Sequence, residues 1–274
     1  YIKPLKKFGQ KIFITFQGAD IQKDQNIKYG YRFDKKYENL LGETLNFTNK
    51  VFAISDDIAK ELNFFNFPKD KIVKIPNSIE IKKFLKINSN TIKNNSLKII
   101  TVARYYEKKK GLDLIEKVSD ILIKNNLNFQ WTLVGRDSSN LLKKDYIIKN
   151  KKFFNIESEI QNLDEIYFPH SKLIELYKRH NVYANLARIE SFGITIIEAI
   201  AAGLPVISFN TKGANEIIVH NENGIIVDDY DAEKMANLII KKYKENYFAK
   251  KINYQKIIKY DLEINTLLTK ENYR

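Results

Sequence analysis

The sequence predicts an α/β protein in which one complete, doubly wound parallel-sheet domain follows a partial domain of the same kind. From residue 97 onward, short apolar runs alternate with amphipathic stretches, which is typical of a parallel sheet wrapped by helices. Residues 1–84 show the same alternation with fewer elements. Between them, residues 85–96 are polar, rich in Asn and Ser and without periodicity, so this segment is the expected linker.

The complete domain is expected to contain strands and helices in strict alternation. The predicted strands lie at residues 97–103, 129–135, 165–168, 182–187, 204–209 and 224–228. The predicted helices lie at residues 111–125, 138–150, 171–179, 194–202, 213–219 and 231–245. The ligand of such a domain binds beyond the carboxyl ends of the strands, so residues that follow the strands are the first candidates for function.

The partial domain has fewer predicted elements. Its strands are expected at residues 11–16, 51–55 and 71–75, and its helices near residues 33–47 and 56–65. This is too little for a doubly wound domain, which usually needs about 150 residues. Two more helical stretches follow, near residues 251–259 and 261–272. The expected domains are residues 1–88, residues 89–258 and a C-terminal helix at residues 259–274.

The composition narrows the class of protein. The absence of cysteine excludes a disulfide framework, a thiolate metal site and a cysteine nucleophile, and it fits a reducing, cytoplasmic compartment. His170, His180 and His220 do not have a metal-ligand spacing, so no metal site is expected. No apolar run approaches the ~18–20 residues that span a bilayer, and no signal-peptide pattern opens the sequence.

The formal net charge of +13 is concentrated toward the N-terminus. Residues 1–86 contain 17 Lys and Arg against 10 Asp and Glu. Their net charge of +7 is more than half of the total of +13. Two interpretations stay open. The charge forms a basic face for an acidic membrane or a nucleic acid, or lysine is the solubilising residue throughout a chain that is rich in Lys, Asn and Ile.

The most informative segment is ARIESFGITIIEAIAAG at residues 187–203. Glu190 follows a predicted strand, and Glu198 lies in the apolar helix that comes next. A carboxylate in so apolar a helix is unfavourable unless a hydrogen bond satisfies it. The amides that open this helix, at residues 193–195, offer positive potential to a phosphate. Either glutamate alone is as easily a solvated side chain, but the combination describes a site for a nucleoside-diphosphate sugar.

This segment resembles the signature of family 4 of the retaining glycosyltransferases, which have the GT-B fold. The signature has two glutamates eight positions apart, here within ESFGITIIEAIAAGLPVI. The block KGANEIIVHNENGIIV (212–227) is similar to the next element of the family, with Ala214 in place of the second glycine of a pair. VARYYEKKKGLDLI (102–115) resembles an arginine-then-lysine-glycine element, with Arg104 and Lys110 in the matching positions.

Two earlier elements match the family with one substitution each. FQGADI (16–21) resembles its His-Gly-x-Asp element, with Gln17 in place of the histidine. KIPNSIEIKKF (74–84) resembles its Pro-Asn-Gly motif, with Ser78 in place of the glycine. His170, in YFPHSK, falls where the family contacts the nucleotide base, and a loop histidine without a role is an equal alternative. The resemblance covers nearly the whole chain.

The resemblance implies a role for each matching residue. Arg104 and Lys110 would hold the diphosphate, which their charge and their place after the first strand of the domain also favour. Glu198 would bind the ribose hydroxyls, and Glu190 with the amides of residues 192–194 would bind the donor sugar. The residues expected to be catalytic are Glu190, Arg104 and Lys110. The expected substrate-binding residues are Glu198, Ser191, Phe192, Gly193, Ile194, Thr195, Gly135, His170 and Gln17.

One other motif has a structural explanation. Asp229-Tyr230-Asp231 spells the Asp-x-Asp metal motif of a different glycosyltransferase fold, but it lies directly before a predicted helix. Asp231 is therefore expected to be the N-cap of that helix. The aromatic residues are scattered through strands and helices, which favours a core role, so nucleic acid is not an expected partner.

The resemblance implies transfer of a sugar from a nucleoside-diphosphate sugar, with UDP-sugar favoured, to an acceptor hydroxyl. The transfer would retain the anomeric configuration and need no metal or other cofactor. The acceptor would be a glycan or glycolipid in bacterial cell-surface synthesis, with the protein peripheral on the inner face of an acidic membrane. The family's N-terminal glycine-rich loop has no counterpart here, so a fragment is expected, with its last helix packed on the N-terminal domain. The alternatives are a catalytically inactive donor-binding fragment and a basic membrane- or nucleic-acid-binding module with an inherited fold.

Overall fold

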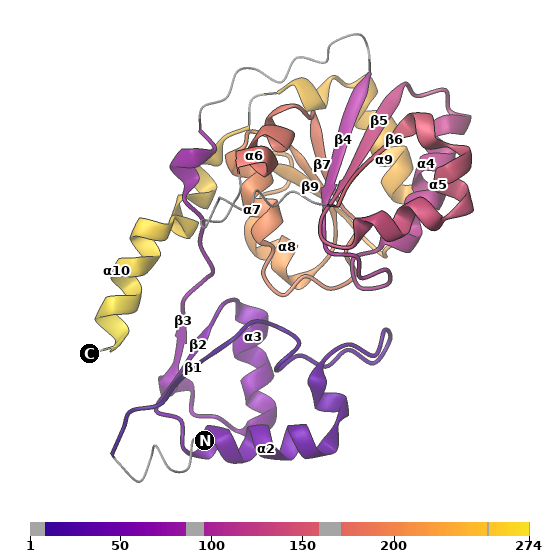
Figure 1. Cartoon of the computed structure of the whole chain (residues 1–274). Coiled ribbons are helices and arrows are strands. Elements are labelled where there is room, and N and C mark those ends of the chain that lie inside the picture. Colours follow the sequence, from indigo (N-terminus) through magenta and orange to yellow (C-terminus); the bar gives the residue numbers. More distant parts are fainter. Residues whose placement is uncertain (1–8, 86–95, 159–170, 251, 274) are drawn as a thin grey trace. The chain divides into compact units, whose positions relative to one another are not determined.

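The computed structural model of the chain describes residues 9–85, 96–158, 171–250 and 252–273. The chain divides into two compact units, one formed by Tyr1–Ser78 with Glu263–Arg274 and the other by Ile79–Leu262 (Figure 1). Each unit contains one parallel β-sheet with helices. The first is the smaller unit and the second is the larger unit.

The larger unit is built on a six-stranded sheet with the strand order β6-β5-β4-β7-β8-β9. Its strands are β4 (Leu97–Val102), β5 (Phe129–Val134), β6 (Phe154–Glu157), β7 (Val182–Asn185), β8 (Val206–Phe209) and β9 (Gly224–Val227). All neighbouring strands are parallel. The chain runs outward from β4 to β6, then returns to β7 on the other side of β4. The order therefore reverses between β4 and β7, which is the place where doubly wound sheets bind their ligands.

Helices cover this sheet on both faces, which confirms the predicted fold class. They are α4 (Ile115–Lys124), α5 (Asp145–Lys149), α6 (Ser171–Lys178), α7 (Ile194–Ala201), α8 (Lys212–Ile217) and α9 (Ala232–Lys244). Helices α4 and α9 pack together on one face, over a core that includes Val118, Trp131 and Met235. Asp231 caps α9 through a hydrogen bond of 2.8 Å from the amide of Glu233 to its carboxylate, so the predicted N-cap is confirmed.

The local structure departs from the sequence-based expectation in three places. Strand β6 was not expected, because it is only four residues long and lies at the sheet edge with a partly exposed face. The segment expected to be one helix at 138–150 is a 3-10 helix followed by the short α5, with a break at Lys144. The segment near 251–259 forms a 3-10 helix and no α-helix. The expected strand at 165–168 lies outside the described residues.

The larger unit also contains short 3-10 helices between its main elements. They are η4 (Ile81–Lys83), η6 (Leu112–Leu114), η7 (Ser138–Lys143), η8 (Lys151–Phe153), η9 (Tyr247–Ala249) and η10 (Tyr254–Tyr260). The bridge between Ile79 and Asp261 joins the beginning of the unit to its end. Because Phe84 and Ile257 beside it are fully buried, both ends are part of the folded unit.

The smaller unit has a three-stranded parallel sheet in the order β1-β2-β3. Its strands are β1 (Phe13–Phe16), β2 (Lys50–Ala53) and β3 (Ile72–Lys74), and its helices are α2 (Lys35–Asn46), α3 (Asp56–Glu61), η1 (Tyr31–Phe33), η2 (Leu62–Phe65) and η3 (Lys69–Lys71). The C-terminal helix α10 (Leu262–Tyr273) belongs to it from Glu263 onward. The ammonium of Lys50 donates a hydrogen bond of 2.9 Å to the carbonyl of Asn272. The domain limits expected at residues 88 and 258 stay a prediction.

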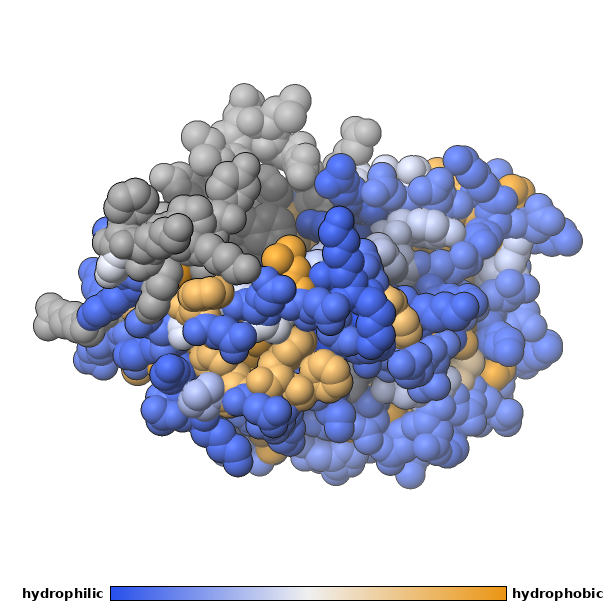
Figure 2. All heavy atoms as spheres, turned by 90° about the horizontal axis from the view of Figure 1, so that it is seen from below, coloured by the Kyte–Doolittle hydropathy of each residue, from blue (hydrophilic) through white to orange (hydrophobic). Residues whose placement is uncertain are grey.

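Hydrophilic side chains cover most of the face shown in Figure 2, with apolar side chains gathered in patches between them. This agrees with a chain that contains 46 Lys and Arg residues. In the described ranges, no helix combines the length and the apolar character that a membrane span requires. Contact with the surface of a membrane stays a prediction.

Candidate active site

Two loops leave the sheet at the point where the strand order reverses, residues 103–111 after β4 and residues 186–193 after β7. The two loops are joined through their backbones, since the amide of Arg188 donates to the carbonyl of Lys109 at 2.9 Å. Gly111 lies directly against Leu186, and a Cβ atom at residue 111 would come within 1.8 Å of the Leu186 carbonyl oxygen. The loops therefore form one surface at the carboxyl edge of the sheet.

This surface brings two of the predicted catalytic residues together. The ammonium Nζ of Lys110 lies 2.7 Å from Oε2 of Glu190, and the two side chains are 20% and 13% exposed. The sequence pointed to both residues but gave no sign that they form an ion pair with each other. Because the pair is partly shielded from solvent, it is stronger than an exposed pair and it fixes both side chains.

Positive charge is in excess around this ion pair. The pKa of Lys109 is lowered from 10.5 to about 8, mainly by burial and also by the charges of Lys110 and Arg104, while Glu190 opposes the shift. Lys109 is thus close enough to the other three groups to be affected by their charges, and the four groups comprise three cations and one carboxylate. Arg104 is exposed, and within the described ranges it forms neither a hydrogen bond nor an ion pair. An anion with two or more charges would balance the cluster.

Helix α7 begins next to Glu190. Gly193 precedes the helix with a φ of 104°, a conformation that favours glycine, and a Cβ atom there would meet Ile196 and Ile217 at 3.1 Å. The amides of Ile194 and Thr195 occupy the first two positions of α7, where no preceding turn can accept their hydrogen bonds. They add positive potential to the surface that the three cations form.

Helix α8 contacts the turn at residues 190–193, which leads into α7. The amide of Gly213 donates to the carbonyl of Glu190 at 2.9 Å. A Cβ atom at residue 213 would lie 2.5 Å from the carbonyl oxygen of Phe192 and 2.6 Å from that of Glu190. Phe192 itself is buried, with its ring edge against Tyr260, so its side chain holds the turn in place and leaves only its backbone for a ligand.

Glu198, on the second turn of α7, is fully buried. Its Oε2 accepts a hydrogen bond of 2.9 Å from the hydroxyl of Tyr177, but its Oε1 has no hydrogen-bond partner among the described residues. Burial raises the pKa of Glu198 from 4.5 to about 7, against the effect of the Tyr177 hydrogen bond. Because buried polar atoms are nearly always paired, Oε1 is a candidate contact for a ligand hydroxyl.

Two tyrosines of the core hold this part of α7. The hydroxyl of Tyr183 donates to Oγ1 of Thr195 at 2.7 Å, and the hydroxyl of Tyr177 reaches Glu198. Thr195, predicted to bind substrate, therefore has a structural hydrogen bond as well. Sequence reasoning missed both tyrosines, since nothing distinguishes them from the apolar residues of the predicted helix and strand around them.

The remaining predicted substrate-binding residues fall in different places. Gly135, at the end of β5, has a φ of 144° and lies so close to the β4 exit that a Cβ atom would be 2.1 Å from the carbonyl of Ala103. Ser191 is buried beside Glu190. Gln17 belongs to the smaller unit, where its Oε1 accepts a hydrogen bond of 2.9 Å from Asn77. His170 lies outside the described residues. The roles assigned to these residues stay predictions.

Both carboxylates of the motif Asp229-Tyr230-Asp231 have structural roles. Asp231 is the cap of α9, and Asp229 pairs with Lys234 at 2.6 Å. Within the part of the chain that the structure describes, no group of three or more His, Asp or Glu side chains could hold a metal ion.

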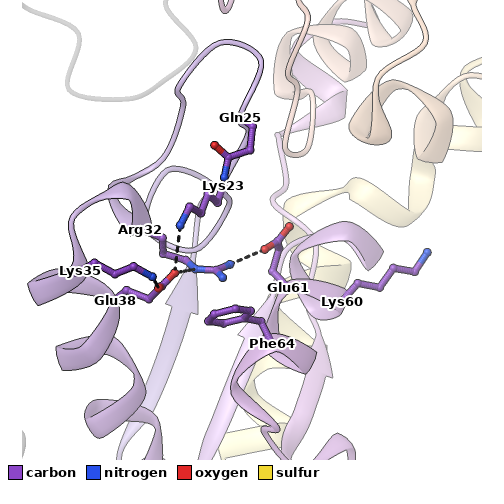
Figure 3. A pocket seen from close by; sticks show the side chains of 8 residues that line it. All are labelled: Lys23, Gln25, Arg32, Lys35, Glu38, Lys60, Glu61 and Phe64. Atoms are coloured by element: carbon purple, nitrogen blue, oxygen red, sulfur yellow. Dashed lines mark hydrogen bonds and ion pairs between the residues drawn. The ribbon is translucent and has the colours of Figure 1, made fainter.

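A hollow of about 420 Å³ lies in the smaller unit (Figure 3). It is lined by Lys23, Gln25, Arg32, Lys35, Glu38, Lys60, Glu61 and Phe64. Arg32 is buried, its Nε lies 3.2 Å from Glu38, and its Nη1 lies 2.7 Å from Glu61 and 2.9 Å from the carbonyl of Ile21. The guanidinium also lies 4.1 Å from the centre of the Phe64 ring. Because Arg32 links α2, α3 and the β1 loop and is neutralised by both carboxylates, its contacts are accounted for by the fold.

The comparison with known proteins agrees with the site in the larger unit. Residues 82–260 match the family described as glycosyl transferases group 1. The chain belongs to this family. Among the curated relatives of this group 1 glycosyltransferase, the amylovoran biosynthesis glycosyltransferase AmsK of Erwinia amylovora is 26% identical over 249 residues, which cover 88% of the chain and 57% of AmsK.

A second relative is a poly(ribitol-phosphate) alpha-N-acetylglucosaminyltransferase of Staphylococcus aureus. It is 24% identical over 216 residues, which cover 78% of the group 1 glycosyltransferase described here and 41% of the relative. The chain thus spans about half the length of these curated relatives.

Solved structures show which fold this group 1 glycosyltransferase has. HepE of Anabaena in complex with UDP-glucose is 17% identical, has a TM-score of 0.78, and is matched over 99% of this chain and 74% of that one. Sucrose-phosphate synthase of Thermosynechococcus elongatus is 17% identical, with a TM-score of 0.76 over 99% of this chain and 69% of that one. At these identities the likeness shows the fold alone, and the fold is GT-B-like, as predicted.

Proposed function

We propose that this chain is the donor-binding part of a retaining, metal-independent family 4 glycosyltransferase. It moves a sugar from a nucleoside-diphosphate sugar, with UDP-sugar favoured, to an acceptor hydroxyl of a bacterial cell-surface polysaccharide or glycolipid. The observation that carries the proposal is the fully buried Glu198, whose Oε1 has no partner among the described residues. It lies on the helix that begins next to Glu190, and Glu190 belongs to a cluster with excess positive charge. A hydroxyl-bearing dianion satisfies both features at once.

The proposal gives each group in the site a separate task. Arg104 and Lys110 bind the diphosphate, together with the amides of Ile194 and Thr195. Glu198 accepts hydrogen bonds from the ribose hydroxyls, and Glu190 orients the donor sugar while it holds Lys110. A set of donors and cations that is already in place stabilises the charge of the leaving diphosphate without reorganisation.

In the proposed reaction, the bond between the anomeric carbon and the β-phosphate oxygen breaks. The acceptor oxygen forms the new bond to the anomeric carbon on the same face of the ring, and the leaving diphosphate takes the acceptor's proton. The cations stabilise the negative charge that develops on the diphosphate. No side chain of the described site is needed as a general base in this scheme.

The relatives support this substrate class. The relative AmsK is named as a glycosyltransferase of amylovoran biosynthesis, and HepE was solved in complex with UDP-glucose. Both are consistent with a nucleotide-sugar donor for the chain. Two alternatives stay open as outcomes of the test, namely donor binding without turnover and a basic membrane- or nucleic-acid-binding module.

The test is calorimetric titration of UDP without added metal into the wild-type chain and the variants Arg104→Ala and Lys110→Ala. Loss of a charged hydrogen bond weakens binding by about 1.5–3 kcal/mol, so each variant should bind about 10- to 150-fold more weakly. Arg179→Ala is the matched control, because Arg179 directly follows α6, is exposed, and among the described residues forms an ion pair with Glu175 alone. Unchanged affinity in both site variants would contradict the proposed donor site.

The two glutamates should respond differently in the same experiment. Glu198→Gln should weaken UDP and UDP-sugar alike, because the ribose belongs to both. Glu190→Gln should weaken free UDP less and should reduce the transfer rate of a full-length enzyme more. The reverse result would mean that the sugar and the ribose occupy exchanged positions.

A further inference from the structure

Arg188 lies two residues before Glu190 and has no part in the proposed chemistry, yet its guanidinium makes three hydrogen bonds. Its Nη1 and Nη2 donate to Oδ1 and Oδ2 of Asp113 at 2.7 and 2.8 Å. Nη1 also donates to the carbonyl of Lys108 at 2.7 Å. This is the two-pronged geometry that only arginine makes with a carboxylate, and the side chains are 22% and 34% exposed.

These contacts act on the loop that carries Lys110. The backbone amide of Arg188 binds the carbonyl of Lys109, and its guanidinium binds the carbonyl of Lys108. The two residues that precede Lys110 are therefore both held by Arg188. Asp113 lies in η6, directly after the loop, and accepts hydrogen bonds from the same guanidinium. Arg188 therefore contacts the chain both before and after Lys110.

The loop has little room to adopt another position. Gly111, with a φ of 65°, lies against the carbonyl of Leu186, and the amides of Lys110 and Leu112 donate to Tyr106 and Glu107 at 2.8 and 2.9 Å. A loop held at this many points has one position. Arg188 supplies the hydrogen bonds that reach the carbonyls of Lys108 and Lys109 from the other loop.

The distance between Lys110 and Glu190 follows from this arrangement. Lys110 is on the braced loop, and Glu190 is two residues beyond Arg188 on the other loop. We infer that Arg188 is a positioning residue: by binding Lys108 and Asp113, it holds the ammonium of Lys110 beside Glu190, where that ammonium meets the diphosphate of the donor. The inference rests on the proposed function for its ligand, but its effect on the loop does not need a ligand.

The test compares UDP with uridine in the variants Arg188→Met and Arg188→Lys. Uridine lacks the diphosphate, so a residue that acts through Lys110 should affect UDP and spare uridine. Arg188→Met should weaken UDP about tenfold, which corresponds to about 1.4 kcal/mol, and should change uridine less than about twofold in ligand-observed NMR. Arg188→Lys should recover little of the loss, because a lysine cannot bind Asp113 with two donors.

A double variant separates positioning from direct contact. In the background Lys110→Met, the further change Arg188→Met should alter UDP affinity by less than about twofold, because the group that Arg188 positions is already gone. A loss as large as in the wild-type background would mean that Arg188 acts independently of Lys110. An equal loss for UDP and uridine would mean a general structural role. Either result would overturn the inference.

Hydrogen exchange of the free protein keeps this test distinct from that of the proposed function. Arg188→Met should speed exchange of the Lys110 and Leu112 amides, and Arg179→Met, directly after α6, should not. If Arg188→Met fails to fold, Asp113→Asn replaces it in the experiment. This variant preserves the size of the side chain and should speed exchange of the same two amides to a smaller extent. Faster exchange in a chain that does not bind UDP would refute the proposed function alone, whereas unchanged exchange and unchanged UDP affinity would refute the role of Arg188.

Discussion

The buried carboxyl of Glu198 makes a prediction about stability that does not depend on any substrate. Its pKa is about 7 in the folded chain and 4.5 without burial, so between these values the folded state binds more protons than the unfolded state. The free energy of unfolding therefore falls as pH rises through this window. The difference in pKa corresponds to about 3 kcal/mol, and this contribution is lost by about pH 8.

The variant Glu198→Gln removes this titration. The amide of the glutamine can form more or fewer hydrogen bonds than the carboxyl did. The resulting difference in unfolding free energy does not change with pH, because the amide does not titrate. The difference in unfolding free energy between wild type and Glu198→Gln should therefore shift by about 3 kcal/mol in favour of the variant from about pH 4 to about pH 8. All other carboxylates are common to both proteins and cancel in the comparison.

The assay is urea unfolding followed by the fluorescence of Trp131. Trp131 is the single tryptophan of the chain and is fully buried in β5, so its signal reports the larger unit, which contains Glu198. Tyr177→Phe is a useful second variant, because loss of the hydrogen bond to Glu198 should raise the pKa of Glu198 and extend the loss of stability to higher pH. If wild type and Glu198→Gln lose stability in parallel as pH rises, the carboxyl is not held in the buried, half-satisfied state described above.

Two further predictions concern the charged clusters of the two units. The pKa of Lys109 is about 8, so its positive charge is lost as pH rises past 8. The affinity for UDP, measured by calorimetry, should therefore fall between about pH 7.5 and 9.5, and this fall should be absent in Lys109→Met. In the smaller unit, Arg32→Met leaves Glu38 and Glu61 without their shared partner and should destabilise the unit by about 3 kcal/mol. Hydrogen exchange of α2 and α3 measures this effect, Lys36→Met on the exposed side of α2 is the control, and equal exchange in the two variants would mean that Arg32 is not the link between these helices.

The sequence was sufficient for the main elements because their apolar periodicity is local. The parallel strands, the apolar helix that carries Glu198 and the cap at Asp231 all follow from a few neighbouring residues. Strand β6 was missed because four residues at a partly exposed edge carry little periodic signal. The break in the predicted helix at 138–150 depends on how its turns pack against the sheet, which is a tertiary effect.

The candidate site was predictable only in part, for a related reason. Charge and position after a strand drew attention to Arg104, Lys110 and Glu190, but the ion pair between the last two spans 80 residues of sequence. The contact of Arg188 with Asp113 spans 75 residues, and the hydrogen bond of Tyr177 to Glu198 joins two helices. Such contacts depend on which strands are neighbours, and no local pattern reports that order.

The hydrogen bonds that join the two loops also limit which substitutions this protein can accept over evolutionary time. Arg188 and Asp113 are useful to each other only together, since either one alone leaves a charged group beside the loop without its two-pronged partner. A relative that lacks a carboxylate at the position of Asp113 is therefore expected to lack the arginine of Arg188 too. The tight contact of Gly111 with Leu186 leaves no space for a side chain at residue 111. Because each loop is held by the other, we expect substitutions in the two loops to occur together.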